Sequence, residues 1–578
     1  MKKVVSLTMA TLMLGSMSFG LAGCNKKFAD HDNALEIYVC TGGYGNEWLE
    51  KALTAFGEKS AIKEKYPKFE YEIVANSEAA FGQNQVLSGG TSCDLMFIGT
   101  FSLDTALQEY KKGQGYLENL NSVFESKIPD YVNGGYEKNA EGVEWTYAEK
   151  MKAANPSNYY DLALYDDNGD IQHYASAYRE SKYGIIYNKT FIDNYGYKDA
   201  TTDETILPRT TDELLAFSKS LATKKDASGN AVTPFVYSAK TLYWPAVQRT
   251  FWGQYEGAEG YDYYFQGLWE NENGEYERNV NVVNNVGILK SWQVLEKLID
   301  YRTGLIHNES AALDFTMAQS YLISGKGLMQ ANGDWVAQEM KGFEGQQGAD
   351  AEIRMMEDPI ISDLAKDKLQ SVETDEEFSA VIGAIRAGLT DLSGEYNIPD
   401  YSGTTATWKS VAYNVSQEDY DRIVEANNVY YNGPRIAPMV IPSYATAKNL
   451  AKDFILYIAS DEFIGQYMKT TGGASSAFYY DLEQKDPITY QNLYPMQKDK
   501  LTQIKGKKSL LAFESSRHPL CMKTSWGATT LTNAEIYFAV KNSDSAKTAQ
   551  QLFDESVRGY TKDNNAAWYA LLQMAGLS

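Results

Sequence analysis

The sequence predicts an α/β fold, and three observations near the N-terminus support this. Residues 35–40 alternate apolar and polar side chains as a strand does, and residues 71–75 repeat the pattern. Residues 94–98 form a near-continuous apolar run, which is typical of a parallel strand buried on both faces. A helix with an apolar stripe follows the first strand, so strand and helix alternate as in a parallel sheet. A ligand of such a sheet is expected at the carboxyl ends of its strands.

The helix after the first strand carries Leu49, Leu53 and Phe56 on one stripe. Trp48 lies one step off that stripe, which favours an exposed indole. The Gly-rich residues 41–46 before the helix lack the Gly-Lys-Ser/Thr of a phosphate-binding loop and the third glycine of a dinucleotide-binding fold. We therefore interpret them as a turn, and no cofactor is expected.

The N-terminal residues predict export from the cytoplasm. Lys2 and Lys3 precede an apolar run over residues 4–19, which is too short for a membrane span and typical of a secretory signal. Residues 21–24, Leu-Ala-Gly-Cys, resemble the bacterial lipobox. That resemblance implies cleavage before Cys24 and acylation of its thiol, whereas the alternative is an ordinary signal with a cysteine nearby. Two or more acyl chains make a stable membrane anchor.

The amino-acid composition excludes several classes of binding partner. The formal net charge of −23 over 578 residues argues against nucleic acid and anionic lipid headgroups as ligands. Beyond Cys24, the cysteines Cys40, Cys93 and Cys521 follow no motif spacing, and the four histidines are widely scattered. Neither a disulfide framework nor a metal site is therefore predicted. The 43 tyrosines exceed what a core of this size needs, which indicates contact surfaces.

Helices are predicted in the middle of the chain. Thr210 and Glu213 have the spacing of a capping box at a helix start. A long helix is predicted over residues 283–301, where Trp292 shares one face with aliphatic residues and is interpreted as core. Residues 315–323 predict a further helix.

Residues 166–170, Asp-Asp-Asn-Gly-Asp, lie between alternating segments. We interpret them as a hairpin turned by Asn168-Gly169. A calcium loop is the alternative, although no Glu lies at the closing position of an EF-hand.

Seven motifs follow one another in an order that resembles the family-1 extracellular solute-binding proteins, the carbohydrate-binding subunits of ABC importers. The motifs are YGIIYNK at 183–189, PRTTDELL at 208–215, YWP at 243–245, SGKGLMQANGDW at 324–335, NLAKDFILYIASDEF at 449–463, GGASSA at 472–477 and TSWGATTLTNAEI at 524–536. Each motif is degenerate alone, but their order and spacing carry the resemblance. The chain is longer than usual for the family, with extra length near 129–170, 385–430 and 480–510.

The resemblance implies the type II periplasmic-binding-protein fold, an α/β architecture with a ligand cleft between two lobes joined by crossing strands. The implied parts are a signal peptide at 1–23, a tether at 24–33, lobe one at 34–178 plus 360–462, and lobe two at 179–359 plus 463–578. It also implies a monomer outside the cytoplasm, anchored by its lipid. This monomer binds a carbohydrate, which we expect to be an oligosaccharide, and delivers it to permease subunits with a cytosolic ATPase.

A sugar packs its C–H faces on aromatic rings and pairs its hydroxyls with polar groups, so the ligand site needs both. Tyr44 and Trp48 belong to the turn after the first strand, and the other candidates match segments that reach the family's cleft. The candidates are Tyr44, Trp48, Tyr178, Tyr243, Trp244, Asp334, Trp335, Gly473 and Trp526, with Arg179, Gly472 and Ser475 beside them. For each aromatic residue the alternative is packing in the core.

Two other functions stay open. A secreted glycoside hydrolase needs two carboxylates at a defined separation, and no pair stands out among 76 acidic residues. A metalloprotease His-Glu-x-x-His and a Gly-x-Ser-x-Gly elbow are both absent from the sequence, so we do not expect an enzyme. A peptide-binding importer subunit would share the aromatic cleft but would need charged anchors for the peptide termini.

Overall fold

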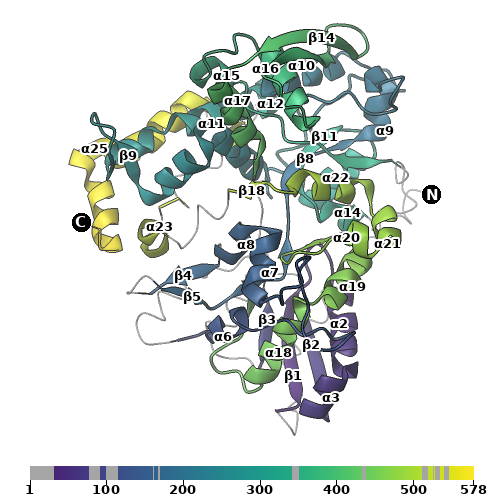
Figure 1. The fold of residues 1–578 in the computed structure, drawn as a ribbon. Helices are drawn as coiled ribbons and strands as arrows, with labels where there is room; N and C mark the ends of the chain where they lie inside the picture. Colours follow the sequence, from purple (N-terminus) through teal and green to yellow (C-terminus); the bar gives the residue numbers. More distant parts are fainter. Residues whose placement is uncertain are drawn as a thin grey trace. The chain divides into compact units, whose positions relative to one another are not determined.

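The computed structural model comprises two compact units (Figure 1). The described residues are 32–76, 92–98, 115–160, 162–166, 170–241, 243–340, 351–431, 438–510, 518–524, 526–527, 534–538 and 546–577. The first unit comprises 1–150, 170–178 and 435–467, and the second comprises 151–169, 179–434 and 468–578. The predicted signal peptide, Cys24 and the Asn168-Gly169 turn lie outside the described residues. Among the described residues, no helix has both the length and the apolar character needed to cross a membrane.

The first unit is built on a five-stranded sheet in the order β2-β1-β3-β16-β6. Its strands are β1 (Ala34–Cys40), β2 (Glu70–Asn76), β3 (Leu95–Phe97), β16 (Pro438–Val440) and β6 (Ser176–Ala177). The three strands predicted near the N-terminus are present, and β1 pairs in parallel with both β2 and β3. β16 pairs antiparallel with β3 and β6, which brings two later segments of the chain into the same sheet.

The helices of this unit cover the sheet with apolar stripes. Helix α2 (Glu47–Glu58) buries Leu49, Leu53 and Phe56, as the sequence predicts. Phe56 packs edge-to-face on Phe454 of α18 (Lys448–Ile458), with ring centroids 5.2 Å apart. α3 (Ser60–Lys65) and α6 (Asn121–Phe124) also belong to this unit, whereas α7 (Tyr147–Ala154) and α19 (Asp461–Thr471) each have residues in both units.

Residues 129–150 of the first extra segment belong to the first unit, where they fold back on themselves. Isolated bridges join Lys127 to Thr146 and Lys138 to Glu144. A buried ion pair between Lys150 and Glu137 holds this segment in place. The Lys150 ammonium also donates to the carbonyl oxygen of Ala459 at 2.7 Å. A buried charge needs such a partner, because an unpaired one would be costly.

The second unit contains a three-stranded antiparallel sheet in the order β11-β8-β12. Its strands are β11 (Met329–Gly333), β8 (Tyr183–Asn188) and β12 (Ile353–Met355). The unit also contains separate two-stranded sheets: β7 (Arg179–Glu180) with β17 (Ser475–Ser476), β9 (Leu268–Glu270) with β10 (Tyr276–Arg278), β13 (Ser393–Asp400) with β14 (Thr407–Asn414), and β15 (Val429–Tyr430) with β18 (Lys508–Ser509). The YGIIYNK motif forms β8 over Tyr183–Asn188.

Helices make up most of the second unit. In chain order they include α8 (Pro156–Tyr160), α9 (Lys189–Ile192), α10 (Thr211–Ala222), α11 (Trp244–Gln266), α12 (Val286–Ile299), α13 (Phe315–Ile323), α14 (Val336–Glu339), α15 (Asp363–Lys368), α16 (Asp375–Arg386), α17 (Gln417–Asn427), α20 (Leu482–Lys485), α21 (Pro487–Gln491), α22 (Pro495–Ile504), α23 (Pro519–Lys523), α24 (Ala534–Phe538) and α25 (Ala549–Ala575).

The predicted helix starts are mostly confirmed. The Thr210 hydroxyl accepts from the Glu213 N–H at 3.1 Å at the start of α10, but the Glu213 carboxylate accepts from the Arg209 N–H at 2.7 Å and so closes the box one residue early. Helix α13 has the predicted bounds. Helix α12 is shorter than predicted, because Asn285 caps it and the flanking turns are 3₁₀ helices. Trp292 lies in the core, as predicted.

The second extra segment forms part of the second unit. β13 and β14 make a hairpin that packs on α16, and α16 in turn contacts α17 (Figure 1). Residues 360–434 therefore cluster with the second unit, whereas the resemblance assigned residues 360–462 to lobe one. Packing of α17 and α15 on the long helix α11 accounts for this placement. The division into functional lobes stays a prediction.

Candidate functional site

Four aromatic side chains from separate segments meet in the second unit, and we call them the Trp335 cluster: Tyr183, Tyr243, Trp335 and Tyr431. The rings of Tyr183 and Trp335 lie edge-to-face with centroids 5.1 Å apart, and Tyr243 is 5.9 Å from Trp335. Tyr431 lies 6.0 Å from Tyr183. Two of the predicted ligand residues, Tyr243 and Trp335, are thus brought together by the fold.

The sheet explains this meeting. β11 and β8 run antiparallel with Gly333 opposite Tyr183, so Trp335, two residues beyond the end of β11, lies beside the start of β8. The Trp335 ring lies against Gly333, where a Cβ atom would come within 2.1 Å of it. Glycine is therefore required at this position for the indole to lie where it does. Trp335 is 7% exposed, while Tyr183 and Tyr243 are half-buried.

A buried ion pair fixes the backbone that carries Trp335. The Lys500 ammonium of α22 lies 2.7 Å from the Asp334 carboxylate, and both side chains are fully buried. Lys500 also donates to the Gly473 carbonyl at 3.1 Å, and the Gln497 amide donates to the Asp334 carbonyl at 2.7 Å. Burial lowers the pKa of Lys500 against the opposing effect of Asp334. Asp334 and Gly473 therefore hold the Trp335 turn in place, and the Asp334 carboxylate is engaged by Lys500.

Charged groups border the Trp335 cluster. Glu339, in the short helix after Trp335, accepts from the Gln319 amide at 2.6 Å. Burial raises the pKa of Glu339 to about 6, although the nearby Arg179 guanidinium lowers it. The Arg249 guanidinium donates to the Tyr431 hydroxyl at 3.2 Å and lies 5.2 Å from that ring's centroid. Aromatic faces with a carboxylate and guanidinium groups at their edge can bind a polar ligand that also has an apolar face.

The predicted candidates in the first unit form a packed aromatic group. Trp48 stacks on Tyr178 with centroids 5.0 Å apart and meets Phe97 edge-to-face at 5.4 Å. The expectation of an exposed Trp48 is wrong: the side chain is 2% exposed, because its indole fills the space beside these rings and its Nε1 donates to the Gly45 carbonyl at 3.0 Å. Tyr44 and Tyr178 are also buried.

Trp244 and Trp526 lie in the core of the second unit. Trp244, the first residue of α11, contacts Phe235 with ring centroids 5.6 Å apart, while the preceding Tyr243 joins the Trp335 cluster. Trp526 stacks on Tyr264 at 5.0 Å and donates from Nε1 to the Tyr264 carbonyl at 2.9 Å. Both indoles are fully buried and present no ring face to a ligand in this structure.

Sequence reasoning did not select Tyr183, Tyr431, Glu339, Arg249 or Lys500. Tyr183 is the first residue of the YGIIYNK motif, so an aromatic residue at the start of that strand could have indicated a ligand contact. The others come from segments far apart in the sequence, and no local pattern connects them.

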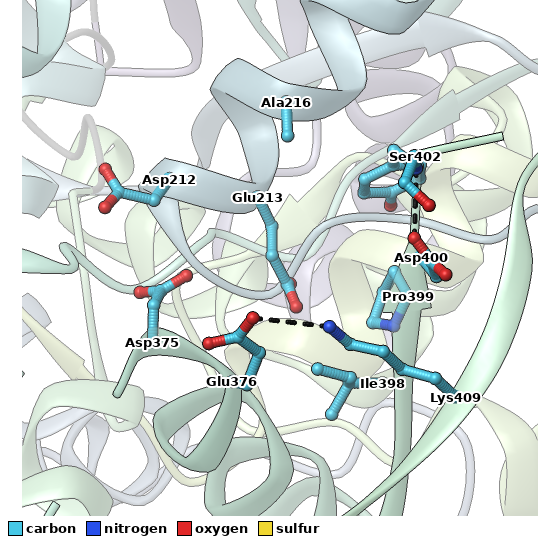
Figure 2. Close-up of a pocket in the computed structure, with 11 residues that line it drawn as sticks. Asp212, Glu213, Ala216, Asp375, Glu376, Ile398, Pro399, Asp400, Ser402 and Lys409 are labelled. Carbon is cyan, nitrogen blue, oxygen red and sulfur yellow. Dashed lines mark hydrogen bonds and ion pairs between the residues drawn. The ribbon is translucent and has the colours of Figure 1, made fainter. Parts of the chain in front are cut away.

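A separate acidic pocket of about 330 Å³ opens where α10, α16 and the β13–β14 hairpin meet. Figure 2 shows Glu213 reaching from α10 into it, with Lys409 pairing with Glu376 at 3.3 Å. Five carboxylates line the pocket: Asp212, Glu213, Asp375, Glu376 and Asp400. Among the described residues, however, no group of three acidic, His or Cys side chains is arranged to hold a metal ion.

The comparisons with known proteins establish the fold. No protein-family model matches the chain, and no curated protein is similar to it in sequence. A structure from work on xylan utilisation by Caldanaerobius polysaccharolyticus is 14% identical, covers 91% of this chain and 99% of its own, and has a TM-score of 0.52. A chitin oligosaccharide binding protein is 12% identical, with 92% and 98% covered and a TM-score of 0.51. The GacH receptor of Streptomyces glaucescens, studied with acarbose, is 13% identical, with 92% and 97% covered and a TM-score of 0.51. This chain therefore has the fold of the family-1 extracellular solute-binding proteins that its motifs resemble.

Proposed function

We propose that this protein is the lipid-anchored, extracytoplasmic solute-binding subunit of an ABC importer, and that it captures an oligosaccharide on the Trp335 cluster. The observation that carries the proposal is the cluster itself, in which aromatic rings converge beside a carboxylate and two guanidinium groups. Proteins of the same fold support the sugar class: one binds chitin oligosaccharide, and another was studied with acarbose.

The chemistry of the Trp335 cluster suits a sugar. The C–H face of a pyranose ring packs on indole and phenol rings, and its hydroxyls donate to carboxylates and accept from guanidinium groups. A hydrogen bond contributes only about 0.5–1.5 kcal/mol net. Because micromolar affinity needs about 8 kcal/mol, several rings and several hydrogen bonds must act together. An oligosaccharide offers more of both than a single sugar ring.

The proposed action is binding followed by delivery, with no bond broken in the ligand. The ligand must interact better with the form of the protein that the permease recognises, since a ligand with equal affinity for two forms shifts neither. The membrane-side partner is a pair of permease subunits with a cytosolic ATPase. Acylation of Cys24 would keep the protein at the outer face of the membrane.

The test is a thermal-shift screen of the mature protein against xylo-, malto- and chito-oligosaccharides, with peptides as a second panel. A ligand that binds only the native state raises the unfolding midpoint by mass action. We expect a shift with one oligosaccharide series and recovery of the sugar intact. A shift with peptides alone would move the proposal to a peptide-binding importer subunit, and shortened sugar products would identify a glycoside hydrolase.

A matched pair of variants locates the site. Trp335→Ala should remove the sugar-dependent shift, whereas Trp408→Ala should keep it. Trp408 is a suitable control because it is 37% exposed on β14 and takes no part in the Trp335 cluster. Equal shifts in both variants would place the ligand elsewhere.

A further inference from the structure

We propose that the second unit holds a further carbohydrate site, which takes a single neutral sugar ring in a pocket of about 450 Å³. The pocket, here called the Tyr480 pocket, is lined by the β7–β17 strand pair, by residues 478–483 and by α22. Its volume lies in the range of small-molecule sites, which is about 300–1,000 Å³. The Tyr480 pocket has no role in the function proposed for the Trp335 cluster.

Two polar residues that line the Tyr480 pocket, Glu180 and Ser475, are deeply buried. Glu180 and Ser475 are directly paired in the β7–β17 register, so their side chains share one face of the strand pair. The Glu180 carboxylate accepts from the Asn155 amide at 3.1 Å and from the Tyr430 hydroxyl. Ser475 is 4% exposed, and its hydroxyl has no hydrogen-bond partner among the described residues. A buried hydroxyl without a partner is costly, and a ligand hydroxyl would satisfy it.

The walls of the Tyr480 pocket are aromatic. Tyr479, Tyr480 and Tyr490 line it, and Tyr479 is exposed to solvent. Carboxylates on the same lining, Asp481 and Glu483, offer acceptors for vicinal hydroxyls. Aromatic faces beside hydroxyl and carboxylate acceptors match the two-sided character of a sugar ring.

Cations already present argue against a small ammonium ligand in this pocket. Lys505 also lines the pocket and offsets part of the negative charge of Glu180, Asp481 and Glu483. The Lys485 ammonium lies 5.2 Å from the centroid of the Tyr480 ring, so that ring already faces a cation. A neutral polyhydroxy ligand meets neither obstacle.

The Tyr480 pocket is distinct from the Trp335 cluster, because strand geometry directs their residues to opposite faces. Successive side chains of a strand point in opposite directions. The positive charge of Arg179 lowers the pKa of Glu339 beside the Trp335 cluster, whereas the next residue, Glu180, lines the Tyr480 pocket. Tyr430 and Tyr431 repeat the separation: Tyr430 donates to Glu180, and Tyr431 belongs to the Trp335 cluster.

The test uses saturation-transfer NMR and calorimetry on the full mature protein carrying Trp335→Ala, so that the proposed primary site is disabled. The probes are glucose, xylose and N-acetylglucosamine, with choline as the cationic comparison. We expect saturation transfer from at least one sugar and none from choline. Adding Tyr480→Ala should abolish the signal, and the exposed Tyr569→Ala should leave it unchanged.

Ser475→Ala separates a ligand contact from a structural role. Loss of one hydrogen bond should weaken sugar binding roughly 2- to 13-fold, while the unfolding midpoint without sugar stays the same or rises, since an unsatisfied hydroxyl has been removed. Three results would overturn the proposal: no transfer from any sugar, transfer that persists with Tyr480→Ala, or transfer from choline instead. None of these depends on whether the Trp335 cluster binds an oligosaccharide, because the cluster is disabled throughout.

Discussion

Replacing Glu213 by Gln should stabilise the protein at pH 8 and have little effect at pH 4.5. Glu213 lies in the acidic pocket of Figure 2, and burial raises the pKa of its carboxyl from 4.5 to about 7. Asp375 raises this pKa further and Arg209 lowers it, but burial is the largest cause. The native state therefore disfavours the charged carboxylate.

The sign follows from linkage. Because the pKa of Glu213 is higher in the folded chain, its contribution to stability is fully present below about pH 4.5 and is lost as the pH rises through about 7. The interval between 4.5 and about 7, at about 1.4 kcal/mol for each pH unit, corresponds to about 3 kcal/mol. A neutral Gln removes this penalty, while its carbonyl can still accept from the Arg209 N–H.

The assay is urea unfolding of Glu213→Gln and the parent at pH 4.5 and pH 8, followed by circular dichroism. Glu376→Gln is the control, since Glu376 is exposed beside the same pocket and pairs with Lys409. We expect a gain approaching about 3 kcal/mol for Glu213→Gln at pH 8 only. An equal effect at both pH values, or destabilisation at pH 8, would refute the burial of a charged Glu213.

Three further predictions concern the Trp335 turn and the anchor. Gly333→Ala should displace the Trp335 ring and abolish oligosaccharide binding in calorimetry, with circular dichroism unchanged, and retained affinity would contradict it. Lys500→Met leaves the Asp334 charge buried without its counterion, so urea unfolding should show a loss of about 3–5 kcal/mol. Adding Asp334→Leu should restore most of that loss, and no recovery would count against the ion-pair account. Cys24→Ala should release the protein from membranes in fractionation, and continued membrane retention would exclude the lipid anchor.

Much of the local structure could be predicted from sequence patterns. The alternation over residues 35–40 corresponds to β1, and the apolar run over 94–98 corresponds to β3. Such strands can be predicted because their hydrophobic pattern is local in the sequence. Helix α13 and the core position of Trp292 follow from the 3.6-residue period. The ordered family motifs predicted the fold as a whole, which the structural comparisons support.

The ligand site was harder to predict from the sequence, because distant parts of the chain decide which side chains are buried and which pair with one another. Tyr243 and Trp244 are adjacent in sequence, yet one joins the Trp335 cluster and the other lies in the core. No pattern around Trp48 indicates that Tyr178 will stack on it. Lys500 lies 166 residues from the Asp334 that it neutralises, so only the folded chain reveals that Asp334 is a structural residue.

The extra segments illustrate the same limit. Residues 393–414 form a hairpin whose strands alternate weakly, and its packing on α16 depends on contacts that local sequence does not encode. The acidic pocket draws its carboxylates from α10, α16 and this hairpin, three segments that are separate in the sequence.

The most direct test of the central claim is titration calorimetry of the parent, Trp335→Ala and Trp408→Ala with the oligosaccharide that the thermal-shift screen selects. Truncating a central aromatic anchor typically costs at least about 2 kcal/mol, so Trp335→Ala should weaken binding roughly 30-fold or more. Trp408→Ala should bind as the parent does. Unchanged affinity in Trp335→Ala would contradict the assignment of the ligand to the Trp335 cluster.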